Sequence, residues 1–249
     1  MLVSLGTNQA LGANSSITLP YACRSISKVF VKVDDTTGSE ALQHTVTVQL
    51  GQRTIMNGVS AWGCIGMQAL QGGHESSTSE AQYQINFGTH QLLDNENVYV
   101  TIQAGVSALD AVDVSALVDE PIGEFPVRYT EYSDNVFTAE NCLTAISYAS
   151  NKGTVDEDAY NIEIRDAVNS SSPSLISANN WYSNEIINDD SAGYYGLLLK
   201  QTAPLTTTFN YSASAATDRI LVASQMGTNA RAVRQGKRQQ AITTSQVGK

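Results

Sequence analysis

Two acidic clusters in the second half of the chain contain the residues best suited to bind a metal ion. Asp156 and Asp158 lie in the stretch "VDEDAYN", and Asp189 and Asp190 are adjacent in "NDD". Carboxylate oxygens are the ligands that Ca²⁺ prefers, so these four residues are the candidates for a structural calcium site. Neither cluster has the glycine and the twelfth-position glutamate of an EF-hand loop, and solvated loop carboxylates are the favoured interpretation. No other cofactor is expected.

No arrangement of residues in the sequence predicts catalysis. The stretch "GVSAWG" at 58–63 approaches the GxSxG motif of hydrolases, but Trp62 stands where the second glycine would be. His44, His74 and His90 share no metal-ligand spacing, and the glycine-rich phosphate and dinucleotide motifs are absent. We therefore expect a protein that is not an enzyme, with no catalytic and no cofactor-binding residues.

One polar loop could bind a sugar. Trp181 and Tyr182 lie in "NNWYSNE", and flat aromatic rings flanked by amides can stack on carbohydrate. The alternative is that Trp181 anchors its loop on a sheet, which is the favoured interpretation.

Positive charge is concentrated near the C-terminus, in "NARAVRQGKR" at 229–238. The net charge is −10, and residues 228–249 hold five basic and no acidic side chains, which leaves −15 on the rest. Within a helix, Arg231, Arg234 and Arg238 would share one side, but an extended segment fits equally well, and Lys237 adds a further positive charge to the run. The acidic body would repel phosphate and no aromatic residue interleaves the basic ones, so sequence-specific nucleic-acid binding is not expected.

The surface of the protein must be built largely from uncharged polar residues. Only 15% of the residues are Asp, Glu, Lys or Arg, against a typical ~25%. Hydroxyl and amide groups cost less to bury against another protein than ions do, because no charge has to be desolvated. The composition therefore favours an extensively contacted protein.

Alternation of apolar and polar residues with a period of two predicts antiparallel strands through most of the chain. In the first half, the apolar faces are Val29, Val31 and Val33; Val46, Val48 and Leu50; Tyr83, Ile85 and Phe87; and Val98, Val100 and Ile102. In the second half, the strand candidates are residues 126–132, 159–164, 194–200, 205–211 and 219–224.

Two segments of the first half depart from this pattern. In the stretch from 105 to 126, Leu109, Val112 and Ala116 share a helical face behind a possible N-cap at Ser107, which predicts a helix. The glycine-rich stretch 57–80 is too long for a plain loop, and its apolar part predicts a short helix or a packed flap.

These elements predict an all-β protein built from two consecutive antiparallel jelly-roll units, that is, two β-sandwiches with short helical insertions. Two prolines after residue 120 place the boundary between the units near 119–125. The expected organisation is an N-terminal arm at 1–13, a first jelly roll at 14–120, a second at 121–227 and the basic tail at 228–249.

The opening residues resemble a known family. Residues 5–33, "LGTNQALGANSSITLPYACRSISKVFVKV", hold a loose arm, a short strand, a loop and a strongly alternating strand. This is similar to the start of the double jelly-roll major capsid proteins of tailless, membrane-containing icosahedral bacteriophages, the corticovirus type in particular. The resemblance implies two jelly rolls side by side, homotrimeric pseudo-hexagonal capsomers, and an icosahedral shell over an internal lipid membrane.

The resemblance also implies where the protein acts and what it meets. It would be made in the host cytoplasm and reside in the virion capsid, in contact with minor capsid or vertex proteins. The segment from Leu2 to Asn14 and the tail residues Arg231, Arg234, Lys237 and Arg238 would lie at capsomer contacts or on the inner face. Another phage structural subunit, such as a tail tube or spike, and a carbohydrate-binding β-sandwich are the alternatives.

Overall fold

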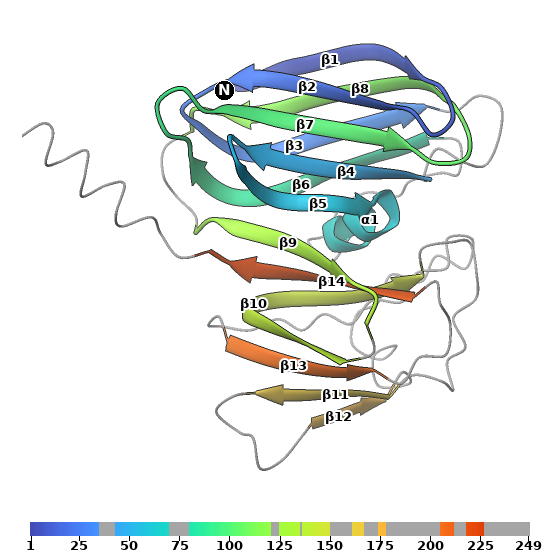
Figure 1. Cartoon of the computed structure of the whole chain (residues 1–249), viewed down its shortest axis with the longest axis vertical. Coiled ribbons are helices and arrows are strands. Elements are labelled where there is room, and N and C mark those ends of the chain that lie inside the picture. The colour runs from blue at the N-terminus through green and yellow to red at the C-terminus, as the bar shows by residue number, and fades with distance from the viewer. Residues whose placement is uncertain are drawn as a thin grey trace, which may run out of the picture.

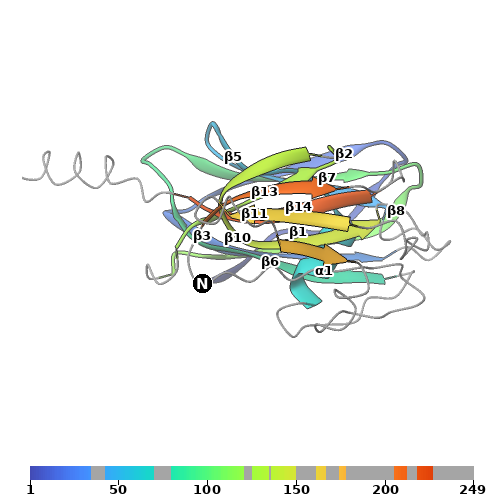
Figure 2. The ribbon, with the colours of Figure 1, turned by 90° about the horizontal axis from the view of Figure 1, so that it is seen from below.

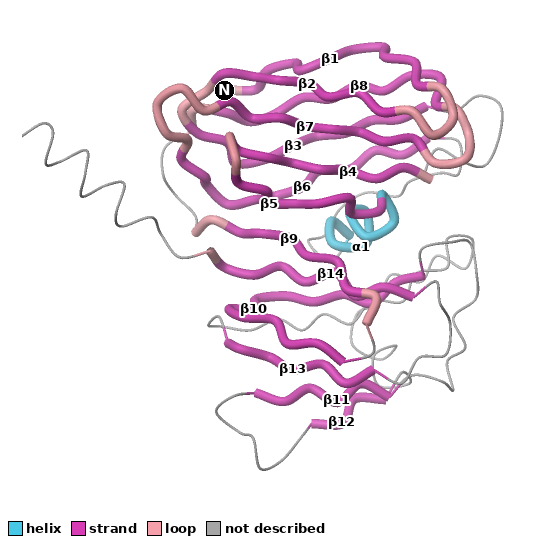
Figure 3. Tube along the Cα trace, in the orientation of Figure 1, coloured by secondary structure: helices cyan, strands magenta, loops and turns pink. Residues whose placement is uncertain are grey.

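The protein is an all-β chain, as predicted. The computed structural model describes residues 1–34, 43–69, 80–120, 125–134, 136–149, 161–166, 174–177, 205–211 and 218–226. These residues form antiparallel sheets with one short helix (Figure 3). The first unit lies at one end of the long axis and the second at the other (Figure 1).

Eight strands build the first unit. They are β1 (Leu2–Leu11), β2 (Ser16–Ala22), β3 (Ser25–Asp34), β4 (His44–Leu50), β5 (Arg53–Ser60), β6 (Glu80–Gln91), β7 (Asn97–Ala104) and β8 (Leu109–Val118). One sheet has the order β1-β8-β3-β6 and the other β2-β7-β4-β5. The pairs β1/β8, β2/β7, β3/β6 and β4/β5 nest around the β4–β5 turn, so the unit is one long hairpin rolled into two sheets, which is a jelly roll.

The predicted apolar faces form the core between these two sheets. Val29, Val33, Val46 and Val48 are fully buried, as are the other predicted inward residues of β3, β4, β6 and β7 to within a few per cent. Viewed end-on, β2 and β5 lie on one side of the unit and β6 on the other (Figure 2). The period-two pattern therefore predicted both the strands and the direction in which their side chains point.

The helix predicted after residue 107 is wrong, because Leu109–Val118 is strand β8. Leu109, Val112 and Ala116 fit a helical spacing, but Val112, Val114, Ala116 and Val118 are all buried, which is the period of a strand. Pairing with β3 on one side and β1 on the other stabilises the extended form, in which β-branched valines pack well.

The segment expected to be a loose N-terminal arm is also a strand. Residues 2–11 form β1, which pairs with β8 from Leu2 opposite Leu117 to Leu11 opposite Leu109. Register shifts near Ser4, Gly6 and Gln9 interrupt the pairing, so a regular period of two does not extend through these residues.

The described part of the second unit is one six-stranded sheet. Its strands are β9 (Val127–Tyr132), β10 (Val136–Ala149), β11 (Asn161–Asp166), β12 (Ser174–Ser177), β13 (Leu205–Tyr211) and β14 (Asp218–Gln225), in the order β12-β11-β13-β10-β14-β9. The pairs β9/β14, β10/β13 and β11/β12 nest in the same way as those of the first unit. The predicted strand at 194–200 lies outside the described residues.

The glycine-rich insertion contains the short helix that was predicted, α1 (Ala61–Ala69). Ser60 is its N-cap, since the backbone N–H of Trp62 donates to the Ser60 hydroxyl at 3.2 Å. Residues 61–68 are buried on every side, because α1 lies between β6 of the first unit and β10 of the second. Within the described residues, no helix is long and apolar enough to span a bilayer.

Candidate assembly surfaces

Every side chain singled out from the sequence for metal, sugar or tail contacts lies outside the described residues. This applies to Asp156, Asp158, Asp189 and Asp190, to Trp181 and Tyr182, and to Arg231, Arg234, Lys237 and Arg238. Their roles therefore stay predictions. Among the residues that the structure does describe, no group of three His, Cys, Asp or Glu side chains could hold a metal ion.

Two of the three histidines are core residues with hydrogen bonds. The His44 Nε2 and the Tyr83 hydroxyl lie 2.6 Å apart between the sheets of the first unit. The His90 Nε2 donates to the Val127 carbonyl at 2.9 Å, and burial lowers the pKa of this imidazole. Both imidazoles therefore serve packing, with His90 linking the first unit to β9 of the second.

The two units meet in a close junction where β6 lies against β9. The Tyr129 hydroxyl donates to the Asn86 carbonyl at 2.6 Å, and the Phe87 and Tyr129 rings meet edge to face with centroids 5.6 Å apart. Gly88 has a φ of +65°, and a Cβ built there would lie 1.9 Å from the Phe125 carbonyl oxygen. Only glycine allows the backbone of one unit to approach the other this closely.

A single hydrophobic core runs through the junction. Tyr129, Ile146, Leu221 and Ala223 of the second unit belong to the same buried cluster as the valines of the first. Gly66 of α1 contributes to this closeness, because a Cβ there would lie 3.0 Å from the Ile146 Cδ1. The two units are therefore fixed side by side by apolar packing, and a linker alone does not account for their arrangement.

Glu131 places an ionisable carboxyl in this junction. The backbone N–H of Ser60 lies 3.5 Å from its Oε1. Burial raises the pKa of Glu131 above its ordinary value, and neither the Ser60 N–H nor the positive charge of Arg219 reverses that direction. The carboxyl of Glu131 is therefore harder to ionise in the folded protein than in water.

The direction of this pKa shift predicts how the stability of the protein depends on pH. The pKa of Glu131 is higher in the folded state than in the unfolded state. Ionisation of Glu131 therefore lowers the free energy of unfolding as the pH rises, and this loss disappears when the pH falls below the pKa of glutamate in the unfolded chain. Glu131→Gln keeps a neutral acceptor for Ser60 and should raise the denaturation midpoint at neutral pH. The gain should vanish near pH ~4, where glutamate is largely protonated in both states.

Chemical denaturation at the two pH values measures this difference. Glu140→Gln, on an exposed position of β10, is the matched control and should leave the midpoint unchanged at both pH values. A Glu131→Gln variant that is less stable than the parent at neutral pH would contradict the assigned sign.

The edge of the first unit that faces away from the second is formed by β1 and β2. Each pairs on one side only within the described sheets, β1 with β8 and β2 with β7. Register shifts distort β1, and Pro20 removes a hydrogen-bond donor from β2. Bulges and proline at an edge oppose the addition of a further strand, so contacts at this edge are expected to use side chains.

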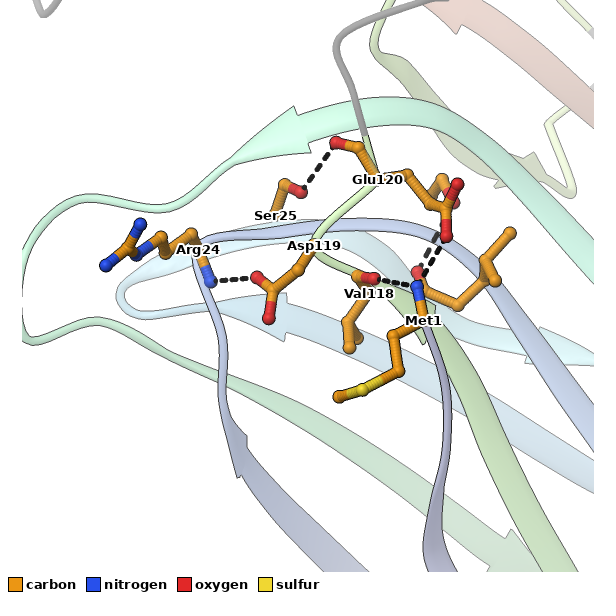
Figure 4. A network of polar contacts seen from close by, with 8 residues as sticks. Met1, Arg24, Ser25, Val118, Asp119 and Glu120 are labelled. Carbon is orange, nitrogen blue, oxygen red and sulfur yellow. Dashed lines mark hydrogen bonds and ion pairs between the residues drawn. The ribbon is translucent and has the colours of Figure 1, made fainter.

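A polar network fastens the start of β1 (Figure 4). The Met1 amino group donates to the Val118 carbonyl at 2.5 Å and forms an ion pair with Glu120. Asp119 adopts a φ of +54°, and its Oδ1 accepts from the backbone N–H of Arg24 at 2.8 Å. The segment expected to be a free contact arm is therefore held in the sandwich.

Several of these residues were missed from the sequence. Gly88 gives no signal because its partner, the Phe125 carbonyl, is 37 residues away in the chain. Pro20 inside the alternating "SITLPYA" could have identified an edge strand, since proline is confined to edges and bulges of sheets. Glu131 is half-buried and lies on the same face of β9 as Val127 and Tyr129, so the alternation of that strand could have identified an inward-pointing carboxyl.

Comparison with known proteins gives matches at the level of structure. No protein-family model matches the chain, and no curated protein matches its sequence. The structure is similar to the STIV major capsid protein, with a TM-score of 0.53 and 11% identity over 90% of this chain and 95% of that one. It is also similar to the major capsid protein P2 from bacteriophage PM2, with a TM-score of 0.54 and 10% identity over 92% and 98%. The resemblance is thus confirmed at the level of fold: the chain has the double jelly-roll fold of viral major capsid proteins.

Proposed function

We propose that this protein is a viral major capsid protein, a structural protein that assembles with copies of itself into the shell of a virion. The observation that carries the proposal is the pair of β units fixed side by side by one core, in an arrangement that matches two capsid proteins over nearly their whole length. The low content of charged residues supports extensive contacts between copies.

The finer proposal is a homotrimeric capsomer of pseudo-hexagonal outline in an icosahedral shell. If each chain contributes two similar jelly-roll units, three chains would form a ring with six similar corners, and such a ring would allow one type of subunit to tile a closed surface. Minor capsid or vertex proteins and an internal lipid membrane are the further partners proposed. The protein would be made in the host cytoplasm and located in the virion.

The assembly state of the purified full chain tests this function. Light scattering and native mass spectrometry should show trimers or larger species, and negative-stain images should show hexagonal plates or spheres. A chain that stays monomeric at high concentration would contradict the proposal. Rings or tubes would support a tail-tube or spike subunit, and glycan binding lost in Trp181→Ala would support a carbohydrate-binding module.

We also propose that residues 228–249 form an inward-facing contact arm. These residues carry five positive charges, whereas the rest of the chain has a net negative charge. A positively charged segment can bind lipid headgroups or acidic patches on neighbouring copies. Deleting these residues should leave both units folded by circular dichroism and impair assembly in the light-scattering assay. Particles of normal yield and stability without the tail would refute this role.

A further inference from the structure

The outward face of the β2-β7-β4-β5 sheet carries no charge. Its outward positions hold only threonine, serine, glutamine, asparagine, tyrosine, glycine, proline and alanine. The central ones are Thr18, Thr101, Gln103, Thr45, Thr47 and Gln49. Arg53, the basic residue of β5, lies opposite the inward-facing Leu50 and contacts Glu96 at 2.9 Å. Within the described residues, this face is therefore wholly neutral.

The other sheet of the same sandwich has a different outward face. Lys28, Lys32 and Asp34 alternate with buried residues along β3, and Asp113 lies opposite Lys32 on β8. Lys32 and Asp34 form a half-exposed ion pair at 3.3 Å. A face of mixed charge is typical of a surface that stays in water, so the two sides of the sandwich face different surroundings.

Hydrogen bonds within the sheet hold the neutral face in one conformation. The hydroxyls of Thr18 and Thr101 lie 2.9 Å apart, and the backbone N–H of Gly58 donates to the Thr47 hydroxyl at 2.8 Å. The Gln49 side-chain amide donates to the Thr54 hydroxyl at 3.3 Å. Because these bonds already order Thr18, Thr47, Thr101 and Gln49, little conformational entropy is lost at these positions when another surface covers them.

Charge identifies the partner. A second copy carries the same net charge of −10, so two copies approach at low cost only where their contact brings no carboxylates together. A neutral hydroxyl and amide face meets that condition, and it can be dehydrated without stranding an ion. A nucleic acid or an anionic lipid surface would instead require basic side chains, which this face does not have.

We propose that the outward face of the β2-β7-β4-β5 sheet is a contact surface between copies of this chain. This inference rests on the proposed shell-forming function and names the surface that serves it. Four strands spaced ~4.8 Å apart over seven residues present roughly 400 Å², about half of the ~800 Å² per partner in a typical stable interface. The face therefore forms one of several contacts that together hold each copy in place.

Charged substitutions on the two sheets test the proposal. Gln103→Glu and Gln103→Lys place an ion on the exposed neutral face, and Gln82→Glu and Gln82→Lys place one on the exposed face of the other sheet. Both Gln103 variants should raise the concentration needed for assembly at least about tenfold. The effect should not depend on whether the new charge is negative or positive, because either ion would be buried between copies without a partner of opposite charge. The Gln82 variants should assemble as the parent does.

Circular dichroism and thermal unfolding first establish that each variant folds. Ser16→Glu, at the exposed position opposite Gln103 on β2, replaces any Gln103 variant that does not. If the folded neutral-face variants assemble normally, or if the Gln82 variants lose assembly to the same extent, this face is not the contact surface, and the proposed shell-forming function is unaffected. A parent chain that never assembles would instead overturn the function itself.

Discussion

Gly88→Ala is expected to destabilise the protein by about 2–5 kcal/mol, because the new methyl group meets backbone at the junction. A left-handed conformation costs an L-residue roughly 1–2 kcal/mol, and forced overpacking adds about 1–3 kcal/mol. Both apply here, since φ is +65° and the Cβ would lie 1.9 Å from the Phe125 carbonyl oxygen. Relief requires moving the chain that leads into β9 away from β6.

Gly58→Ala is the matched control for this substitution. Gly58 has a φ of +58°, but a Cβ built there meets no atom within 4 Å. Only the conformational cost remains, about 1–2 kcal/mol. Denaturant unfolding of both variants separates the cost of the left-handed backbone conformation from the cost of the steric clash with Phe125. Equal losses of unfolding free energy would show that the units do not approach closely at Gly88.

The sequence predicted the strands that alternate regularly and missed those that do not. Val46, Val48 and Leu50 could be placed in the core because a half-buried strand has a period of two. The sequence predicts a helix at β8 because Leu109, Val112 and Ala116 fit a helical spacing, whereas Val112, Val114, Ala116 and Val118 fit a period of two, and only the neighbours β1 and β3 decide between the two patterns. Pairing between distant strands is tertiary information that a local pattern does not contain.

The candidate surfaces, too, could be predicted from the sequence only in part. The neutral outward face can be read from "HTVTVQL", whose polar positions are Thr45, Thr47 and Gln49, once the strand is recognised. That this face belongs with the outward residues of β2 and β7 depends on the jelly-roll order, which brings together strands up to about 85 residues apart in the chain. The half-buried position of Glu131 beside Ser60 depends on the second unit packing against the first.

Phe87→Ala should destabilise both units together, because the ring lies where their cores merge. Phe87 is fully buried and meets Tyr129 and His90 edge to face. Removing a buried phenylalanine typically costs about 3–5 kcal/mol through lost burial and the cavity that remains. Phe30→Ala, at an outward and half-exposed position of β3, deletes the same ring and should cost less than about 1.5 kcal/mol.

Native-state hydrogen exchange distinguishes a shared core from two independent ones. If Tyr129, Ile146 and Leu221 depend on the same packing as β6, the amides of β3 and of β14 should lose protection by similar amounts in Phe87→Ala. Loss confined to the first unit would mean that the sandwiches unfold separately and that the junction is only a contact. The proposed shell-forming function requires the first result, because a second unit that moved independently of the first would not hold its contacts with other copies at a fixed spacing.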